Sequence, residues 1–287
     1  MEKRVENPGS SQVAEPKEVR TGITRRNFGK AALAVSAGVL LPRTSLGKSE
    51  GAASRGNPSA GITVVLVHGA FADGSSWSGV IPLLEAKGFT VIAVQNPLTT
   101  LAEDVASTRR IVAQQTGPGP VILVGHSYAG FVISEAGNAA NVSGLVYVSS
   151  YGPAEGESHD DLVKRFAPPA GIPAIHLDSD GFLWVAREKF QEAFAHDVDT
   201  TQASIMAAVQ KPIAKKCFAA PLGVPAWKLK PSWFLVSDND RLINPELQRF
   251  MVKRMGAISA SVPSSHASLV SHPVEVVNLI SQAASHA

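Results

Sequence analysis

The stretch that decides the fold of this chain is VILVGHSYAG, residues 121–130. Four apolar residues lead into Ser127, which has Gly125 two positions before it and Ala129 two positions after it. Such a sequence predicts a buried strand, a sharp turn that presents one serine, and the beginning of a helix, because so tight a bend has no room for larger side chains. Ser127 is therefore the candidate nucleophile, although Ala129 stands where the strict G-x-S-x-G pattern has its last glycine.

The composition is that of a globular protein. The chain has 287 residues, of which 45% are hydrophobic and 17% charged, enough for one large or two small domains. Residues 1–60 hold 10 of the 26 Lys and Arg but only 5 of the 24 Asp and Glu, so the rest of the chain carries a charge of about −3. A mildly acidic body without a basic stripe gives no reason to expect nucleic acid as a partner. One cysteine, Cys217, excludes an intramolecular disulfide and a cysteine-rich metal site.

Residues 1–60 predict a twin-arginine signal peptide and a flexible leader. Residues 24–30, TRRNFGK, fit the twin-arginine pattern, and an apolar run follows at residues 31–41. A helix of eleven residues spans about 16 Å, too short for a hydrocarbon core of about 30 Å, which favours a signal peptide over a stable membrane anchor. Small residues suit cleavage at residues 45–47 and at 52–54. We therefore expect recognition by the twin-arginine (Tat) export machinery and a periplasmic or secreted location.

The remainder of the chain predicts an α/β architecture. An apolar run without alternation, as at residues 62–67, is typical of a strand covered on both faces. Further strands are expected at residues 90–94, 121–124, 142–148, 233–236 and 258–262. Segments with helical spacing of apolar residues lie between or after them, at residues 75–87, 101–115, 128–139, 245–255 and 273–284. This alternation predicts a parallel sheet layered with helices.

A long segment interrupts this rhythm. It contains helical stretches at residues 160–166, 181–195 and 200–215 but no comparable strand run. We expect one domain over residues 61–287, with a core formed by residues 61–150 and 229–287 and a helical cap formed by residues 151–228.

Four polar side chains follow predicted strands at the edge where functional groups of parallel sheets collect. A serine hydroxyl needs a base to take its proton and a third group to orient that base. Ser127 follows the third strand, Asp238 and Asp240 follow the fifth, and His266 follows the sixth, in the order expected for a serine upstream of its partners. Asp240 is favoured over Asp238 because it leads into the turn before a helix, whereas Asp238 suits a turn residue. His266 is favoured over His272, which stands beside a proline at a helix start.

Acyl transfer also needs donors for the developing oxyanion. We expect them to be the N–H of Tyr128, directly after the serine, and that of Ala70, or of Phe71, in the loop after the first strand. His68 and His126 flank the site, and we expect both to be buried and bonded to the backbone. The remaining histidines are expected to be surface or cap residues: His159, His176, His196 and His286. No histidine pair has ligand spacing on a helix, so we expect no metal.

The motifs VLVHGA, GHSYAG, SDNDRLINPELQRF and SSHAS, spread over residues 61–287, resemble those of the α/β-hydrolase superfamily. Residues 240–250 look most like the branch of plant methylesterases and hydroxynitrile lyases with its bacterial relatives. The resemblance implies a mostly parallel sheet of six strands, a helical cap over the pocket, and an acid at Asp240. It also supports the amides of Ala70 and Tyr128 as oxyanion donors.

Two positions discriminate between activities in that branch. Its hydroxynitrile lyases resemble one another in having a threonine in the first loop and a lysine directly after the catalytic histidine. Gly69 and Ala267 stand there instead, so nothing is available to hold a cyanide leaving group. Ser127 excludes the nucleophilic aspartate of haloalkane dehalogenases and epoxide hydrolases.

We therefore expect a cofactor-independent serine esterase whose substrate is a small-molecule carboxylic ester or a lactone. Alternatives are C–C bond cleavage, lyase activity or cofactor-free perhydrolysis on the same scaffold, and a non-catalytic ligand-binding protein. Phe71, Phe182 and Trp184 are candidates for lining the substrate pocket, with Phe190 and Phe194 as further choices; packing inside the cap is the alternative for the four aromatic residues of the cap. The sequence leaves the substrate and the oligomeric state open.

Overall fold

The structure is a computed structural model that describes residues 61–115, 117 and 119–287. The expected signal peptide, with both candidate cleavage places, and the expected leader lie outside the described residues. Within the described part of the chain, no helix is long and apolar enough to span a bilayer.

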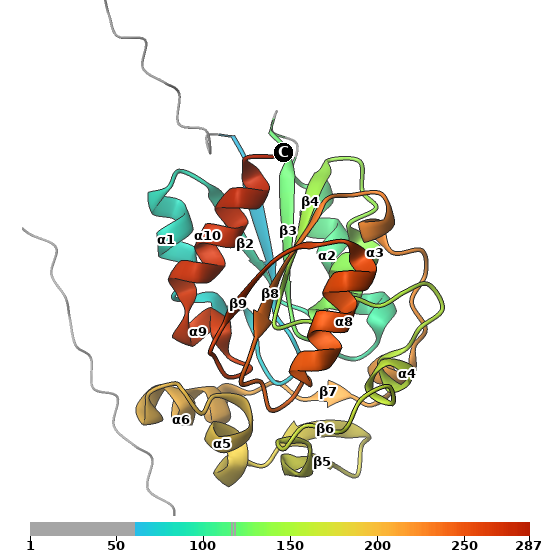
Figure 1. The fold of residues 1–287 in the computed structure, drawn as a ribbon, viewed down its shortest axis with the longest axis vertical. Helices are drawn as coiled ribbons and strands as arrows, with labels where there is room; N and C mark the ends of the chain where they lie inside the picture. Colours follow the sequence, from blue (N-terminus) through green and yellow to red (C-terminus); the bar gives the residue numbers. More distant parts are fainter. Residues whose placement is uncertain (1–60, 116, 118) are drawn as a thin grey trace, which may run out of the picture. The chain divides into compact units, whose positions relative to one another are not determined.

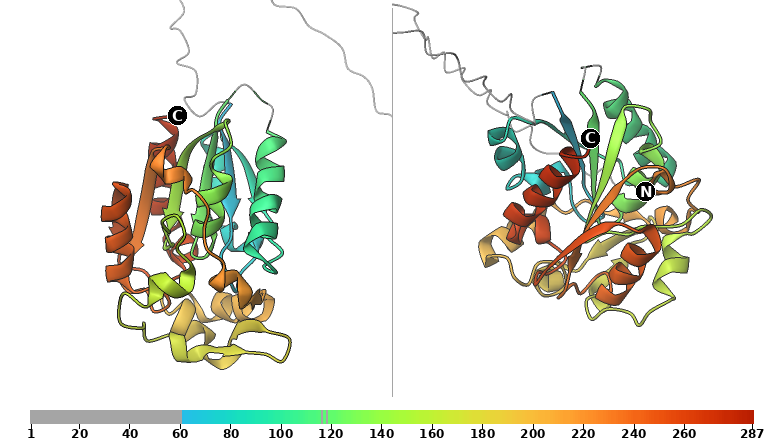
Figure 2. Two further views of the ribbon diagram at one scale, coloured as in Figure 1. Left: turned by 90° about the vertical axis from the view of Figure 1, so that its right-hand side faces the viewer. Right: turned by 45° about the horizontal axis from the view of Figure 1, so that its top comes forward.

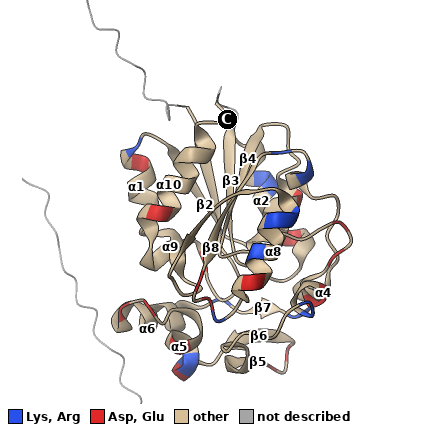
Figure 3. Cartoon of the chain, viewed as in Figure 1, with Lys and Arg blue, Asp and Glu red and all other residues tan. Residues whose placement is uncertain are grey.

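A sheet of six strands forms the middle layer, and every neighbouring pair in it is parallel (Figure 1). Its order is β2-β1-β3-β4-β8-β9. The strands are β1 (Thr63–Val67), β2 (Thr90–Val94), β3 (Val121–His126), β4 (Val142–Val148), β8 (Ser232–Ser237) and β9 (Ile258–Val262). None of the six contains Lys, Arg, Asp or Glu, and charge lies on the helices and loops instead (Figure 3). This is the composition of a sheet covered on both faces, and the expected α/β architecture is confirmed.

Helices cover both faces of the sheet (Figures 1 and 2). The single-turn helix η1 (Gly74–Trp77), α1 (Ile81–Ala86), α9 (Ser268–Ser271) and α10 (Pro273–Ala284) lie on one face; α2 (Leu101–Ala113), α3 (Ala129–Ala136) and α8 (Pro245–Met255) lie on the other. Successive side chains of a strand point to opposite faces. Val64 and Leu66 therefore join the first layer with Ile280, whereas Val65 and Val67 join the second.

Most of residues 151–228 lie across the end of the sheet where its strands have their carboxyl termini, and the last part returns beside α3 to the start of β8 (Figures 1 and 2). Their helices are α4 (His159–Val163), η2 (Ile172–Ala174), η3 (Arg187–Lys189), α5 (Phe190–Phe194), α6 (Thr200–Val209), α7 (Lys216–Ala219) and η4 (Ala226–Lys228). They also contain an antiparallel sheet in the order β5-β6-β7, formed by β5 (Ile175–Leu177), β6 (Phe182–Val185) and β7 (Ile213–Ala214). The insertion is therefore mixed rather than helical.

The expected helix over residues 181–195 is wrong in its first half. A turn joins β5 to β6, and in it the Asp178 carboxylate accepts the N–H of Phe182 at 2.8 Å. Gly181 has a φ of 83°, which glycine adopts without strain. The segment Asp178-Ser-Asp-Gly181 is thus a hairpin turn, and only Phe190–Phe194 of the predicted range is α-helical.

The expected helix over residues 200–215 ends early, at Val209. The Gln210 side chain turns across to β6, where it accepts the Val185 N–H at 3.0 Å and donates to the Val185 carbonyl at 2.9 Å. Pro212 follows, and proline cannot donate a helix hydrogen bond. The chain therefore continues as the edge strand β7.

Candidate active site

Ser127 lies on a sharp turn between β3 and α3. Its φ of 56° is in the left-handed region that a serine rarely adopts. The Ser127 carbonyl accepts hydrogen bonds from the Gly130 N–H at 3.0 Å, the Tyr151 N–H at 3.2 Å and the Ser150 hydroxyl at 2.8 Å. These contacts stabilise the strained conformation, and the turn accommodates Ala129, which is fully buried.

The turn also explains the nearby glycines. A Cβ on Gly125 would lie 2.9 Å from the Ala129 carbonyl oxygen, and one on Gly69 would lie 2.8 Å from the Ser127 Cβ. Both distances are too short for any residue with a side chain. The loop after β1 therefore approaches the serine as closely as a backbone can.

The structure brings Ser127, His266 and Asp240 together in one hydrogen-bonded chain. Ser127 Oγ lies 2.9 Å from His266 Nε2, and His266 Nδ1 lies 2.8 Å from Asp240 Oδ2. An ionised carboxylate can only accept, so Nδ1 carries the imidazole proton and Nε2 is free to accept from the serine. All three side chains are buried.

Asp240 is held in place by donors on both oxygens. Its Oδ1 accepts the N–H groups of Leu242 at 2.8 Å and Ile243 at 2.9 Å, and its Oδ2 accepts from the Gln248 side chain at 2.9 Å. Asp238 instead forms an ion pair with Arg249 at 2.6 Å on a more exposed surface. The geometry therefore distinguishes the two aspartates, and Asp240 faces the histidine.

The other histidines near the site contact backbone or solvent-side groups. His272 lies at the start of α10, 2.9 Å from the Ser271 hydroxyl and 3.9 Å from Asp197. His126 Nε2 lies 2.9 Å from the carbonyl oxygen of His266, so its N–H supports the backbone of the loop that carries the base. Burial and the adjacent His266 hold the pKa of His126 well below its usual range.

His68 is also fixed by the backbone. The Gly69 carbonyl lies 2.9 Å from Nδ1, and the Asn96 N–H donates to Nε2 at 3.0 Å. The proton is therefore on Nδ1. Burial lowers the pKa of His68 to about 4, so the ring is neutral at pH 7.

The backbone amides of Ala70, Phe71 and Tyr128 lie near the serine and have no acceptor among the described residues. β1 and β3 are paired as far as Val67 and Gly125, which places the loop after β1 beside the turn after β3. Phe71 has a φ of 60°, another rare value. Unpaired amides beside a candidate nucleophile are the groups that could stabilise an oxyanion.

A model of the alpha/beta hydrolase family matches residues 64–279. The chain belongs to this family. It is 25% identical over 249 residues to the alpha/beta hydrolase nvfD of Aspergillus novofumigatus, covering 78% of this chain and 97% of the relative. It is 31% identical over 121 residues to a pyrethroid hydrolase of Sphingobium wenxiniae, covering 38% of this chain and 43% of that one. The crystal structure of a methylesterase from Arabidopsis is similar with a TM-score of 0.66 and 18% identity, over 78% of this chain and 99% of the other.

The cavity at the serine of this alpha/beta hydrolase combines strand-end loops with the insertion. It is lined by Ala70, Phe71, Ser127, Tyr128, Tyr151, His159, Ile172, Ile175, Phe218, Leu242, Ile243 and His266. Phe71 lies in it, as the sequence predicts. His159, which we expected to be a surface or cap residue, lies on α4 of the insertion and also lines this cavity. Nothing in the local sequence distinguishes this position, since only the folding of the insertion brings α4 to the serine.

Phe182 and Trp184 are not brought to this cavity. Both lie on β6, and the Trp184 indole N–H donates to Asp178 at 2.8 Å. Leu183, between them, lines the adjoining larger cavity. The period of two in a strand places Phe182 and Trp184 on the face opposite Leu183, away from the cavities. Phe190 and Phe194 are buried, and Phe194 packs edge-on against the His266 ring at 4.9 Å.

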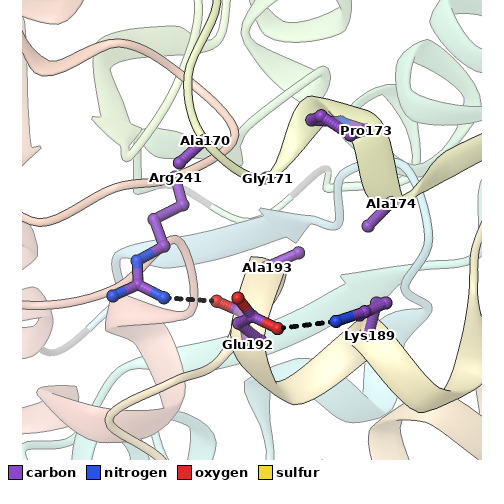
Figure 4. A pocket seen from close by; sticks show the side chains of 8 residues that line it. All are labelled: Ala170, Gly171, Pro173, Ala174, Lys189, Glu192, Ala193 and Arg241. Carbon is purple, nitrogen blue, oxygen red and sulfur yellow. Dashed lines mark hydrogen bonds and ion pairs between the residues drawn. The ribbon is translucent and has the colours of Figure 1, made fainter.

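A separate pocket of the hydrolase lies between η2, α5 and the loop after β8 (Figure 4). It shares no lining residue with the cavity at Ser127. Arg241 donates to the Glu192 carbonyl at 3.2 Å, and Lys189 forms an ion pair with the Glu192 carboxylate at 3.2 Å, as the dashed lines show. Its charged groups thus contact one another rather than the serine.

Proposed function

We propose that the protein is a serine hydrolase that cleaves carboxylic esters through an acyl-enzyme intermediate. The observation that carries this proposal is the chain from Ser127 Oγ to His266 to Asp240, with distances of 2.9 and 2.8 Å. These are the distances that proton transfer requires. Similarity to a methylesterase and to a pyrethroid hydrolase supports the same class of chemistry.

The mechanism assigns one role to each group. His266 Nε2 takes the proton of Ser127 as its oxygen attacks the ester carbonyl, and Asp240 stabilises the resulting imidazolium. The amides of Ala70 and Tyr128 donate to the oxyanion. His266 then protonates the departing alcohol, and a water molecule activated by the same imidazole cleaves the acyl-enzyme.

The lining of the cavity favours hydrolysis over lyase activity. None of the residues that line it is Lys or Arg, and Ala267 follows the histidine. A cyanide leaving group would therefore find no ammonium to stabilise it. Ester hydrolysis needs no such cation, because its leaving alcohol receives the proton of His266.

Turnover of p-nitrophenyl acetate and butyrate by the wild type and by Ser127→Ala tests the proposal. We expect measurable hydrolysis in the wild type and a loss of at least 10³-fold in the variant. A fluorophosphonate probe should label the wild type and not the variant, which distinguishes an enzyme from a ligand-binding protein. Activity that survives in Ser127→Ala would contradict the assignment.

We also propose that the protein is exported through the twin-arginine route, on the strength of residues 24–41. Replacing Arg25 and Arg26 by lysine should keep the protein in the cytoplasm, which cell fractionation measures. Unchanged export of that variant would contradict the proposal.

A further inference from the structure

A second, larger cavity adjoins the one at Ser127. It has a volume of about 340 Å³, against about 60 Å³ for the cavity at the serine. The two share a wall that includes Tyr151, His159 and Phe218. Beyond this wall the larger cavity is mainly apolar, with Pro168 and Leu247 among its lining residues. A space for about two water molecules at the nucleophile therefore opens into one that holds a ring-sized group.

The residues shared by the two cavities include one hydrogen-bonded pair of polar side chains, Tyr151 and His159. The Tyr151 hydroxyl lies 3.0 Å from His159 Nε2, and His159 Nδ1 lies 3.2 Å from the Asp160 carboxylate. The other polar side chains of the larger cavity are Asn244, which caps α8 and bonds the Ala167 carbonyl, and Lys164, which is 74% exposed. Only Tyr151 and His159 among these four also line the cavity at Ser127.

The chain of contacts fixes which group donates. Hydrogen bonding from His159 holds the pKa of Asp160 below its usual range, so this carboxylate is ionised and can only accept. In the neutral imidazole, Nδ1 then carries the proton and Nε2 accepts from the Tyr151 hydroxyl. The Tyr151 oxygen keeps its lone pairs as acceptors. The His159 ring is held by stacking on Phe218, with centroids 4.0 Å apart, so the pair is preorganised.

We propose that Tyr151 and His159 select esters that carry a hydroxyl or N–H donor near the ester group and an aromatic or similarly apolar body beyond it. The donor binds the Tyr151 oxygen, and the body occupies the larger cavity. This inference rests on the proposed ester hydrolysis. One hydrogen bond of this kind corresponds to about a tenfold preference for the hydroxylated substrate.

Two matched substrate pairs test the selection, one for each side of the ester. The acyl pair is methyl mandelate and methyl phenylacetate; the alcohol pair is 2-hydroxy-2-phenylethyl acetate and 2-phenylethyl acetate. For the pair whose body enters the larger cavity, Tyr151→Phe should lower the ratio of kcat/KM between hydroxylated and plain ester about tenfold. Tyr147→Phe is the matched control, because the buried Tyr147 hydroxyl lines neither cavity. Its hydrogen bond, of 2.8 Å, is to the Ser134 hydroxyl. The control variant should leave both ratios and p-nitrophenyl acetate turnover unchanged.

A third ester and a second variant test the direction of the hydrogen bond. Methyl 2-methoxy-2-phenylacetate, and 2-methoxy-2-phenylethyl acetate on the alcohol side, can accept but not donate. In His159→Phe the Tyr151 O–H has lost its acceptor and can donate, so the methoxy ester should gain relative to the hydroxy ester. The phenyl ring keeps the stacking on Phe218.

The outcomes separate this inference from the proposed function. Equal ratios in the wild type and Tyr151→Phe for both pairs, with Ser127-dependent acetate turnover intact, would overturn the selection and leave the esterase proposal standing. A failure to hydrolyse any of these esters or p-nitrophenyl acetate would overturn both.

Discussion

At the scale of single residues, Asp240 and Asp238 differ by contact rather than by chemistry. Asp240 accepts from His266, whereas Asp238 pairs with Arg249. Asp240→Asn should lower kcat for p-nitrophenyl butyrate by about 10³ to 10⁴, because an amide donor would favour the imidazole tautomer that cannot accept from Ser127. Asp238→Asn is the matched control and should keep kcat within about twofold, since exposed ion pairs contribute little. Equal losses in the two variants would contradict the assignment of the acid.

A buried carboxyl beside the site makes a second prediction about one residue. Asp104 is fully buried; its oxygens accept from the Tyr128 hydroxyl at 2.9 Å and from the Leu98 N–H at 2.8 Å. Burial raises the pKa of Asp104 from 3.8 to about 6. The folded state therefore binds this proton more tightly than the unfolded chain. The contribution of Asp104 to the free energy of unfolding is complete below pH 3.8 and is lost as the pH rises through 6.

Asp104→Asn should remove this dependence. Between pH 4.5 and 7.5, the wild type should lose about 2 kcal/mol of unfolding free energy relative to the variant, from a shift of about two pKa units. Urea denaturation at both pH values measures it. Asparagine keeps an acceptor for Leu98 and a polar partner for Tyr128, so the variant should fold. A difference between the two proteins that is the same at both pH values would refute the prediction.

The site residues that could be predicted from the sequence are those that a neighbouring sequence pattern identifies. Ser127, Asp240 and His266 each lie in the loop or turn that follows a strand, and parallel strands end at one edge of the sheet. His159 follows no core strand and reaches the cavity through α4 of the insertion. Its contact with Tyr151 depends on how the insertion folds over the sheet, which no local pattern encodes.

At the scale of elements, the turn between β3 and α3 depends on Gly130. A Cβ there would lie 1.8 Å from the Tyr151 carbonyl oxygen, in the segment that also holds the Ser127 carbonyl. Gly130→Ala should therefore displace this segment, cost about 2–3 kcal/mol of stability and lower kcat at least tenfold. Ala129→Gly, one position earlier, removes a methyl group and should cost about 1 kcal/mol without a comparable loss of kcat. Wild-type kcat in folded Gly130→Ala would show that the turn tolerates the displacement.

The elements of the insertion show where prediction from sequence fails. The central strands β1, β3 and β4 are buried and mostly apolar because two helical layers cover them, so their sequences identify them without further context. β6 is four residues long and half-buried, and its sequence FLWV fits a helix as well as a strand. Its identity comes from the hairpin turn after β5 and from the Gln210 side chain, which lies 25 residues away. Short elements defined by such distant contacts are the ones that propensity alone misassigns.

At the scale of the whole molecule, buried histidines lie at the edge of the sheet that carries Ser127. His68 and His126 are fully buried and bond the backbone of the loops on either side of Ser127. Protonating either ring would place a charge where water cannot solvate it. Folding therefore opposes protonation of both, and the stability of the molecule as a whole is coupled to acid.

This coupling predicts how the molecule responds to mild acid. Burial lowers the pKa of His68 from 6.5 to about 4, so its contribution is complete above pH 6.5 and is lost as the pH falls toward 4. From pH 7.5 to 5.0 this one residue should cost the wild type about 2 kcal/mol of unfolding free energy. His68→Gln can keep one donor and one acceptor but not the imidazole ring, so it should fold and be less stable than the wild type at pH 7.5. Because glutamine does not titrate, the variant should lose less unfolding free energy on acidification. Urea denaturation at both pH values measures the difference in unfolding free energy between the wild type and His68→Gln, which should narrow by about 2 kcal/mol on acidification. His176→Gln, at an exposed position on β5, is the control and should follow the wild type. If this difference were the same at both pH values, acid would destabilise the protein through groups other than His68.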